Sequence, residues 1–306
     1  MSVLLLNDDD VRRHLDAPRT VRAVREALLA AHAGDLVAPP RVHAELGDGR
    51  LVFTAGRLRA QQLFGFRVYD TAVGAEHLVA VWNGGDGRLR AVVHGAELGS
   101  RRTGAIGAVA VDAVANPGPV RLGLVGTGPE AWAQLWAVRA VRRLTEVAVA
   151  SRRPERAQAF ARRAADELGV GVRAVGTVEE AVRERDVVIL ATNSPTPVLA
   201  ADWIAPGTHV TTLGPKSAAR HELPAALARR ARLIVTDSPA QVADYGEPLA
   251  LPVEQMVGLG AVLAGAEAGR TGREEITVFC SVGLAGTEVA VAARLLEAVE
   301  AEAQSR

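Results

Sequence analysis

One stretch of the chain, residues 120–140, constrains the fold more than any other. A short apolar run that is typical of a buried parallel strand leads into Gly-Thr-Gly-Pro-Glu-Ala at 126–131, and apolar residues then recur at helical spacing. Gly126 allows a tight turn, Gly128 lets a phosphate approach the backbone, and Ala131 lets the helix pack on the strand. Free N–H groups at the helix start favour an anion. The pattern predicts a dinucleotide site, although a strand-turn-helix unit that binds nothing is the alternative.

Strands and helices alternate after this turn, which is typical of a doubly wound parallel sheet. We expect strands at 146–150, 172–175, 187–192, 209–213, 233–236 and 276–281, and helices at 153–168 and 178–184. The sequence therefore predicts an α/β Rossmann domain over residues 118–284.

The segment before the turn has a different pattern. It predicts helices at 11–15 and 20–31, short strands at 50–54, 65–70, 76–82 and 89–94, a hairpin turn at 84–87, and a small-residue helix at 101–115. Asn116-Pro117-Gly118-Pro119 breaks that helix. A closing helix at 286–302 is expected to return to this part. We therefore predict a mostly antiparallel α+β domain, 1–117 plus 285–306, into which the Rossmann domain is inserted.

Composition excludes several classes of function. The formal net charge is zero, which gives no support for a nucleic acid or an anionic membrane as partner. No apolar run reaches the roughly 20 residues of a membrane helix. The N-terminus carries acidic residues where a signal peptide carries basic ones, so we expect a cytoplasmic protein. Cys280 is the only cysteine and the histidines lack metal-ligand spacing, so no metal site is expected.

Lys216 is the only lysine in a chain rich in arginine. Arginine stays protonated, whereas a buried lysine can release a proton. Lys216 could therefore do chemistry that arginine cannot, although a surface lysine without a role is the alternative.

The second strand of the Rossmann domain indicates which dinucleotide is bound. NAD enzymes usually place an acidic residue about 20 positions beyond the glycines, on the ribose 2′-hydroxyl. This chain has Ser151-Arg152-Arg153 instead, and guanidinium groups suit a 2′-phosphate. The sequence favours NADP(H), with NAD(H) possible; an arginine pair that only meets solvent is the alternative.

These features together resemble the ornithine cyclodeaminase/mu-crystallin family. The matching stretches are Pro40-Arg41, 65–68, 102–105, the glycine turn, 191–194, 206–210, Glu222-Leu223, Gly246-Glu247 and 278–283. They stand in the family's order and spacing over nearly the whole chain. The resemblance implies an N-terminal substrate and dimerisation domain, an inserted Rossmann domain, a homodimer, and a small amino- or imino-acid substrate between the domains, beside the nicotinamide.

The resemblance also implies roles for single residues. Arg41 and Arg102 match arginines that hold the substrate carboxylate, and Glu288 matches an acidic residue near the last helix start, where helix capping is a sufficient explanation. The residues expected at the cofactor are Gly126, Thr127, Gly128, Pro129, Glu130, Ala131, Ser151, Arg152, Arg153, Ala191, Thr192, Asn193, Leu213, Gly214, Ser281 and Gly283.

Two positions depart from the family pattern. Arg67 stands where the family has a catalytic lysine, and arginine can only orient groups or neutralise charge. Lys216 aligns with the aspartate of the cyclodeaminases. We infer that Lys216 has taken over proton transfer, with its pKa lowered by Arg41, Arg67 and Arg102. The extra cation argues against ornithine as substrate.

We therefore expect an NAD(P)H-dependent oxidoreductase that reduces an imine next to a carboxylate, or the reverse, as ketimine reductases and amino-acid dehydrogenases do. Arg41, Arg67 and Arg102 would bind the substrate, while Lys216 and Arg67 would act in catalysis. A cyclodeaminase that releases ammonia with tightly bound NAD is one alternative, and a non-catalytic, NADPH-dependent binding protein is another.

Overall fold

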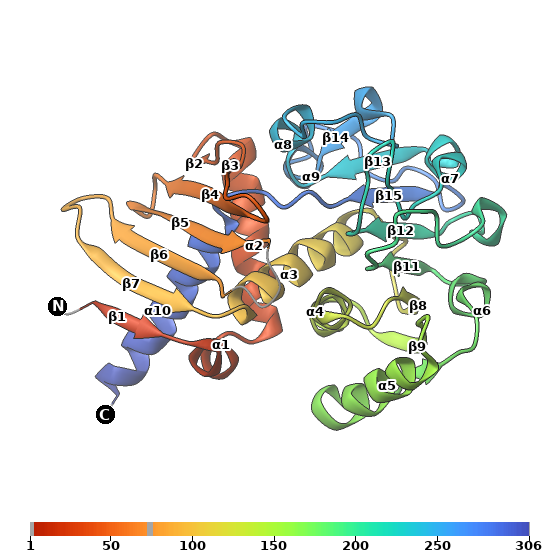
Figure 1. The fold of residues 1–306 in the computed structure, drawn as a ribbon, viewed down its shortest axis with the longest axis horizontal. Helices are drawn as coiled ribbons and strands as arrows, with labels where there is room; N and C mark the ends of the chain where they lie inside the picture. The colour runs from red at the N-terminus through yellow and green to blue at the C-terminus, as the bar shows by residue number, and fades with distance from the viewer. Residues whose placement is uncertain (1–2, 72–75, 306) are drawn as a thin grey trace.

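Two β-sheets lie side by side, and helices connect and cover them (Figure 1). The structure is a computed structural model that describes residues 3–71 and 76–305. The N-terminal sheet has the strand order β1-β7-β6-β5-β4-β2, and β3 also pairs with β4. Its strands are β1 (Leu4–Leu6), β2 (Leu36–Val37), β3 (Val42–Glu45), β4 (Arg50–Leu58), β5 (Leu63–Asp70), β6 (Leu78–Asn83) and β7 (Leu89–His94).

Helices cover one face of this sheet. They are α1 (Asp8–His14), α2 (Ala17–His32), α3 (Glu97–Val114) and the C-terminal α10 (Thr287–Gln304), which runs behind β5 and β6 in Figure 1 and contacts β4, β5 and β6. Strand β4 shows why one face is covered: Val52, Thr54, Gly56 and Leu58 are buried, while the residues between them are more exposed. This alternation is expected when a strand faces a core on one side only.

The second sheet is parallel throughout and has the order β10-β9-β8-β11-β12-β15-β13-β14. Its strands are β8 (Val120–Val125), β9 (Leu144–Ala150), β10 (Arg173–Ala174), β11 (Val187–Leu190), β12 (His209–Thr212), β13 (Leu233–Thr236), β14 (Met256–Gly258) and β15 (Thr277–Cys280). Strands β11, β12 and β15 are buried along their whole length. Parallel sheets need such cover on both faces, which explains the continuous apolar runs in the sequence.

The helices of this second half are short apart from two. They are α4 (Pro129–Val138), α5 (Pro154–Leu168), α6 (Val178–Val182), α7 (Ala225–Arg230), α8 (Pro239–Ala243) and α9 (Leu259–Leu263), with the 3-10 helices η1 (Ala201–Trp203) and η2 (Val253–Gln255). In the part of the chain that the structure describes, none is long and apolar enough to cross a bilayer.

Helices α3 and α4 join the two halves through an unusually close contact. A Cβ on Gly104 would lie 2.2 Å from the backbone oxygen of Ala133, so only glycine fits there. Gln134 then donates a hydrogen bond from its side-chain amide to the carbonyl of Thr103, at 3.1 Å. The contact brings the first turn of α4 toward the N-terminal half of α3.

The expected α/β class, with a doubly wound parallel sheet beside a mostly antiparallel one, is confirmed. The domain limits of 1–117 with 285–306, and 118–284, stay a prediction. The expected helix at 101–115 begins one turn earlier, at Glu97, because the carboxylate of Asp8 accepts the Glu97 N–H at 2.9 Å. The short strands β1, β2, β3 and β14 were missed, and β1 runs parallel to β7, which makes the N-terminal sheet mixed.

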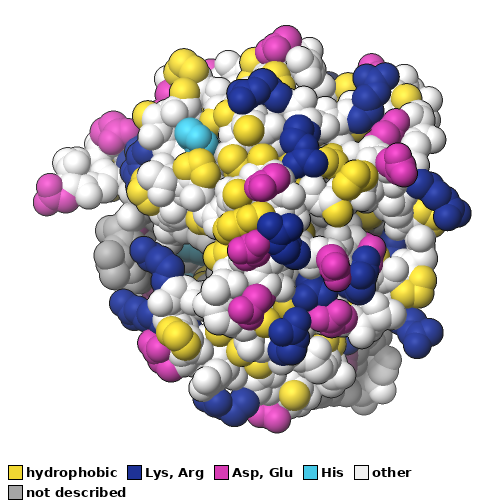
Figure 2. Space-filling view, turned by 90° about the vertical axis from the view of Figure 1, so that its right-hand side faces the viewer, with side chains coloured by type: hydrophobic (Ala, Val, Ile, Leu, Met, Phe, Trp, Pro, Cys, Tyr) yellow, Lys and Arg dark blue, Asp and Glu magenta, His cyan; other side chains and the backbone are white. Residues whose placement is uncertain are grey.

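Positive and negative side chains are interspersed on the face formed by the second half of the molecule (Figure 2). Some ion pairs join residues four apart in the sequence, namely Arg163 with Glu167 in α5, and Glu179 in α6 with Arg183, which directly follows that helix. Exposed pairs of this kind contribute only about 0–1 kcal/mol each to stability. The stability of this half therefore comes mainly from its buried strands.

The burial of His209 in β12 predicts how the free energy of unfolding depends on pH. Its ring is fully buried between the hydroxyls of Thr277 and Thr211, at 2.9 and 3.1 Å, and burial lowers its pKa to about 3. The unfolded chain binds a proton at this residue near pH 6.5, whereas the folded chain does not, so stability falls as the pH drops below about 6.5, by up to about 1.4 kcal/mol per pH unit.

The variant His209→Gln removes this titration. We expect the difference in unfolding free energy between wild type and variant, measured by urea denaturation, to narrow steadily between pH 7 and pH 5. A difference that stays constant over this range would contradict the assignment.

Candidate active site

The carboxyl ends of five parallel strands meet at one edge of the second sheet. The loops that begin there contain Gly126 after β8, Ser151 after β9, Ala191 after β11, Leu213 after β12 and Ser281 after β15. Ligands of doubly wound sheets bind at this edge. The structure thus brings together the loops on which all the expected cofactor residues lie, including the exposed Asn193.

The glycine turn has the shape that a dinucleotide needs. Gly126 has φ +112°, and a Cβ there would lie 2.2 Å from the backbone oxygen of Ala191. Gly128 precedes the first residue of α4, and a Cβ there would meet no atom of the described residues within 4 Å. Ala131 is fully buried against the sheet. The turn therefore leaves open space in front of the N–H groups at the start of α4, which fits a pyrophosphate.

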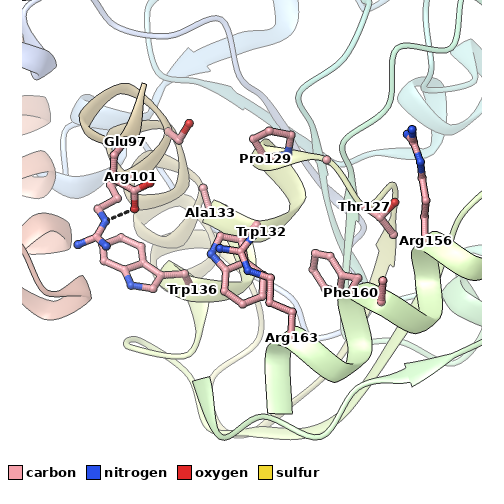
Figure 3. A pocket seen from close by; sticks show the side chains of 13 residues that line it. Glu97, Arg101, Thr127, Pro129, Trp132, Ala133, Trp136, Arg156, Phe160 and Arg163 are labelled. Carbon is pink, nitrogen blue, oxygen red and sulfur yellow. Dashed lines mark hydrogen bonds and ion pairs between the residues drawn. The ribbon is translucent and has the colours of Figure 1, made fainter. Parts of the chain in front are cut away.

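A cavity of about 490 Å³ borders this turn, between α3, α4 and α5 (Figure 3). Thr127, Gly128 and Pro129 line one side of it, and the guanidinium of Arg163 lies 3.8 Å from the ring centre of Trp132 on the other. The side chains of α4 and α5 thus leave the approach to the glycine turn open.

The adenosine end of the site is basic. The Ser151 hydroxyl accepts the Arg153 N–H at 3.3 Å and lies 3.4 Å from the Thr127 hydroxyl. The side chains of Arg152 and Arg153 are exposed, and no described residue forms an ion pair with them. They lie at the end of β9 and not with the other predicted arginines, so they remain available to a phosphate group.

Glu222 organises the middle of the site, and sequence reasoning gave it no role. Its buried carboxylate accepts hydrogen bonds from the N–H groups of Thr192, Leu213 and Gly214, at 2.7–3.1 Å, and from the hydroxyls of Thr192 and Thr212 at 2.7 and 2.8 Å. One side chain therefore fixes the loops after both β11 and β12. Its only signal in the sequence was its place in a family-like Glu-Leu pair.

Asp237 does the same for the loop after β15. Its carboxylate accepts three consecutive N–H groups, those of Val282, Gly283 and Leu284, at 2.7–2.8 Å. The carbonyls of Val282 and Gly283 then accept hydrogen bonds from the guanidinium of Arg41. Asp237 therefore positions Arg41 through the backbone of this loop.

The three predicted substrate-binding arginines lie in one cluster. A Cβ on Gly283, which has φ +82°, would lie 2.3 Å from Nη2 of Arg41 and 3.1 Å from Nη1 of Arg102. Arg102 and Arg67 share the carboxylate of Glu288. The Nε atoms of all three arginines are buried and have no hydrogen-bond partner among the residues that the structure describes. Buried donors without partners are rare in proteins, so this cluster fits an anionic ligand.

Glu288 corrects an expectation, because its side chain does not cap a helix. It is fully buried, bonds Arg102, lies 3.7 Å from Nη1 of Arg67, and accepts the Thr54 hydroxyl at 3.3 Å. Burial acts to raise its pKa, but the charges of Arg102 and Arg67 outweigh burial and the pKa is lowered. Glu288 is therefore an ionised counter-charge for the cluster.

Arg67 is held on several sides. Its guanidinium stacks on the ring of Tyr69 at 4.4 Å from the ring centre, and its Nη2 lies 2.9 Å from Nδ1 of His77. Burial and then the charge of Arg102 lower its pKa, against the opposing effect of Glu288. Arg67 stays a cation, but a poorly solvated one that gains from a second anion.

Lys216 is buried and does not point to solvent. Its ammonium donates to the carbonyls of Gly214 at 2.7 Å and Leu213 at 3.3 Å. Its pKa is lowered, as expected, but the main cause is burial, and Arg41 alone among the three arginines adds to it. The direction of the shift is the expected one, but the arginine charges are not its main cause.

The fold and the site together define a class: an α/β protein whose dinucleotide edge faces a buried arginine cluster. The chain belongs to the ornithine cyclodeaminase/mu-crystallin family, whose model matches residues 2–303.

Individual relatives support this assignment. The Δ(1)-pyrroline-2-carboxylate reductase of Bacillus cereus is 33% identical over 219 residues, which cover 69% of this chain and 67% of that protein. The structure of the Thermococcus litoralis enzyme of the same name, in complex with NADH and L-proline, matches with a TM-score of 0.90 at 25% identity over 98% of each chain. An archaeal alanine dehydrogenase dimer with bound NAD matches with a TM-score of 0.89 at 29% identity, over 99% of this chain and 97% of that one.

The hydrogen bonds of Glu222 predict that its substitution weakens cofactor binding without unfolding the protein. In Glu222→Gln one acceptor oxygen becomes a donor, which leaves backbone N–H groups of the loops after β11 and β12 without a partner, at a cost of about 1–3 kcal/mol. We expect a lower melting temperature and weaker binding of the reduced dinucleotide, NADH or NADPH, measured by fluorescence titration.

The matched control is Glu247→Gln, a glutamate in the loop after α8 for which no hydrogen bond or ion pair is found among the described residues. It should keep the wild-type melting temperature and affinity. Wild-type affinity for the reduced dinucleotide in Glu222→Gln would contradict the role of Glu222.

Proposed function

We propose that this protein is an NAD(P)H-dependent oxidoreductase that reduces the C=N bond of an imino acid next to its carboxylate, or runs the reverse reaction. The observation that carries the proposal is the cluster of Arg41, Arg67 and Arg102, with its buried unpaired donors, at the loop that follows β15. The names of the relatives, an imine reductase and an amino-acid dehydrogenase, support the same chemistry.

Each cation has a separate proposed task. Arg41 and Arg102 bind the substrate carboxylate, since a guanidinium offers two parallel N–H groups to it. Arg67 neutralises charge beside them. When bound, NAD(P)H supplies a hydride from C4 of its nicotinamide. Lys216 supplies the proton that the nitrogen gains, because burial has brought its pKa toward the range of a general acid.

We propose NADP(H) as the preferred cofactor. The basis is the pair Arg152 and Arg153 at the end of β9, where no carboxylate is available for a ribose 2′-hydroxyl. The related structures carry NADH or NAD, so this preference distinguishes the present chain from them.

We also propose a homodimer. The face of the N-terminal sheet opposite α10 carries exposed apolar side chains, with Val42 at 63% and Phe64 at 37% exposure and Phe64 stacked on Trp82. Exposed apolar clusters mark association surfaces. The archaeal alanine dehydrogenase is described as a dimer, which supports the same assembly.

The buried ammonium of Lys216 limits the substrate side chain. A second cation, such as the side-chain ammonium of ornithine, would be repelled beside it. We therefore propose a substrate with a neutral or acidic side chain.

The proposed role of Lys216 as proton donor can be tested with two variants, one that keeps its positive charge and one that does not. Lys216→Arg keeps a cation but cannot release a proton near neutral pH, whereas Lys216→Ala removes both. We expect both variants to lower kcat for NADPH-dependent reduction of Δ(1)-pyrroline-2-carboxylate by roughly 10²–10⁴-fold. An unchanged kcat across pH 6–9 in either variant would remove Lys216 from the mechanism.

The cofactor preference can be tested with Arg152→Ser and Arg153→Ser. Loss of a charge-assisted contact with the 2′-phosphate should raise the KM for NADPH by roughly tenfold or more and leave the KM for NADH little changed. Arg162→Ser, an exposed arginine in the middle of α5, is the control. Equal effects on both cofactors would contradict the preference for NADP(H).

A further inference from the structure

Glu130, the second residue of α4, has an unusual environment for a residue of the glycine turn. Its Oε2 has no accessible surface and no hydrogen-bond partner among the described residues. A buried carboxylate oxygen without a donor costs free energy, so its persistence needs an explanation.

A role at the helix N-terminus does not explain this burial. Acidic residues are favourable in the first turn of any helix. Helix α5 begins with the same Pro-Glu pair, Pro154-Glu155, and there the glutamate is exposed. Glu155 has the same interaction with its helix without losing solvent, so a place at a helix N-terminus does not by itself account for the buried oxygen of Glu130.

The surroundings of Glu130 are those of the substrate cluster. The charges of Arg102, on α3, and Arg67, on β5, both act on its carboxyl group. The close contact of α3 and α4 at Gly104 and Ala133 lies three residues further along α4, so Glu130 shares with Ala133 the face of α4 that packs on α3. Both arginines already bond Glu288, and neither forms a hydrogen bond or ion pair with Glu130.

We propose that the carboxylate of Glu130 binds the nitrogen of the substrate and so selects imino and amino acids over oxo and hydroxy acids of the same carbon skeleton. The inference rests on the proposed function and extends it to the recognition of the nitrogen.

An amino or imino acid carries a negative carboxylate and a positive nitrogen, which match the arginine cluster and the neighbouring carboxylate of Glu130. Its carboxylate fits the donors of Arg41 and Arg102, and its iminium or ammonium N–H groups fit the unpaired acceptor of Glu130. In an oxo acid, the carbonyl oxygen would take the place of the nitrogen and face the carboxylate of Glu130. Both groups only accept hydrogen bonds, so no bond can form between them. Sites built to bond a substrate N–H discriminate strongly against an analogue that lacks it.

Protonation of Glu130 should weaken this recognition. Burial raises the pKa of its carboxyl group, although Arg102 and Arg67 oppose the shift. The charged form that attracts a cation is therefore lost, as the pH falls, at a higher pH than for an ordinary glutamate. The same ion cluster contains Glu288, whose pKa is lowered and which stays ionised over this range.

The direct test is binding to the holoprotein with saturating NADPH, which permits no turnover of an amino acid. Melting-temperature shifts are compared for L-proline against cyclopentanecarboxylate and for L-alanine against L-lactate. The two ligands of a pair have nearly the same shape and the same carboxylate, and only the amino acid contains a nitrogen. Three proteins are measured: wild type, Glu130→Gln and the matched control Glu155→Gln.

We expect wild type and Glu155→Gln to be stabilised more by the amino acid of at least one pair, and Glu130→Gln to lose that preference. In steady-state assays Glu130→Gln should raise the KM for Δ(1)-pyrroline-2-carboxylate by roughly tenfold or more, with a smaller change in kcat. The acidic limb of the wild-type kcat/KM profile should be shifted or lost in this variant.

Two results overturn the inference in different ways. If wild type binds amino acids and reduces imines but Glu130→Gln keeps the same preference and KM, only the role of Glu130 fails. If wild type itself neither reduces an imino acid nor distinguishes the paired ligands, the proposed function fails and takes this inference with it.

Discussion

The buried ion cluster around Glu288 is the interaction on which the rest of the site depends. Glu288 lies in the first turn of the C-terminal helix α10, Arg102 lies on α3 and Arg67 lies on β5, so one carboxylate connects three elements that are far apart in the sequence. Buried charges are costly unless they are paired. The cluster contains more positive than negative charge, and its unpaired Nε atoms point to an anionic group supplied from outside.

Carboxylates that bond the backbone hold the remaining parts of the site in place. Asp237 binds the loop after β15, and Glu222 binds the loops after β11 and β12. Neither carboxylate forms an ion pair with a described basic side chain. The loops are therefore fixed before any ligand binds, which reduces the cost of ordering them.

Much of the fold could be predicted from the sequence because its signals are local. The glycine turn needs only the residues at 126–131 and the apolar strand before them, and Arg41, Arg67 and Arg102 were identified through motifs in the family's order. Glu222 and Asp237 were given no role and Glu288 was misassigned, because their partners are backbone groups or arginines that become neighbours only when distant strands and helices assemble. The same reason explains the start of α3, which depends on Asp8, and the pKa of Lys216, where burial proved more important than the arginine charges.

We propose that Arg41 and Arg102 hold the carboxylate of a small substrate so that NAD(P)H, when bound, would supply a hydride to the carbon between that carboxylate and the nitrogen. Reduction of Δ(1)-pyrroline-2-carboxylate with NADPH deuterated at C4 tests it most directly, with the product examined by mass spectrometry and NMR. The account predicts one deuterium on the α-carbon of proline, from one of the two C4 positions only. Product without deuterium, or ammonia released from a diamino acid with no net oxidation of the cofactor, would contradict it.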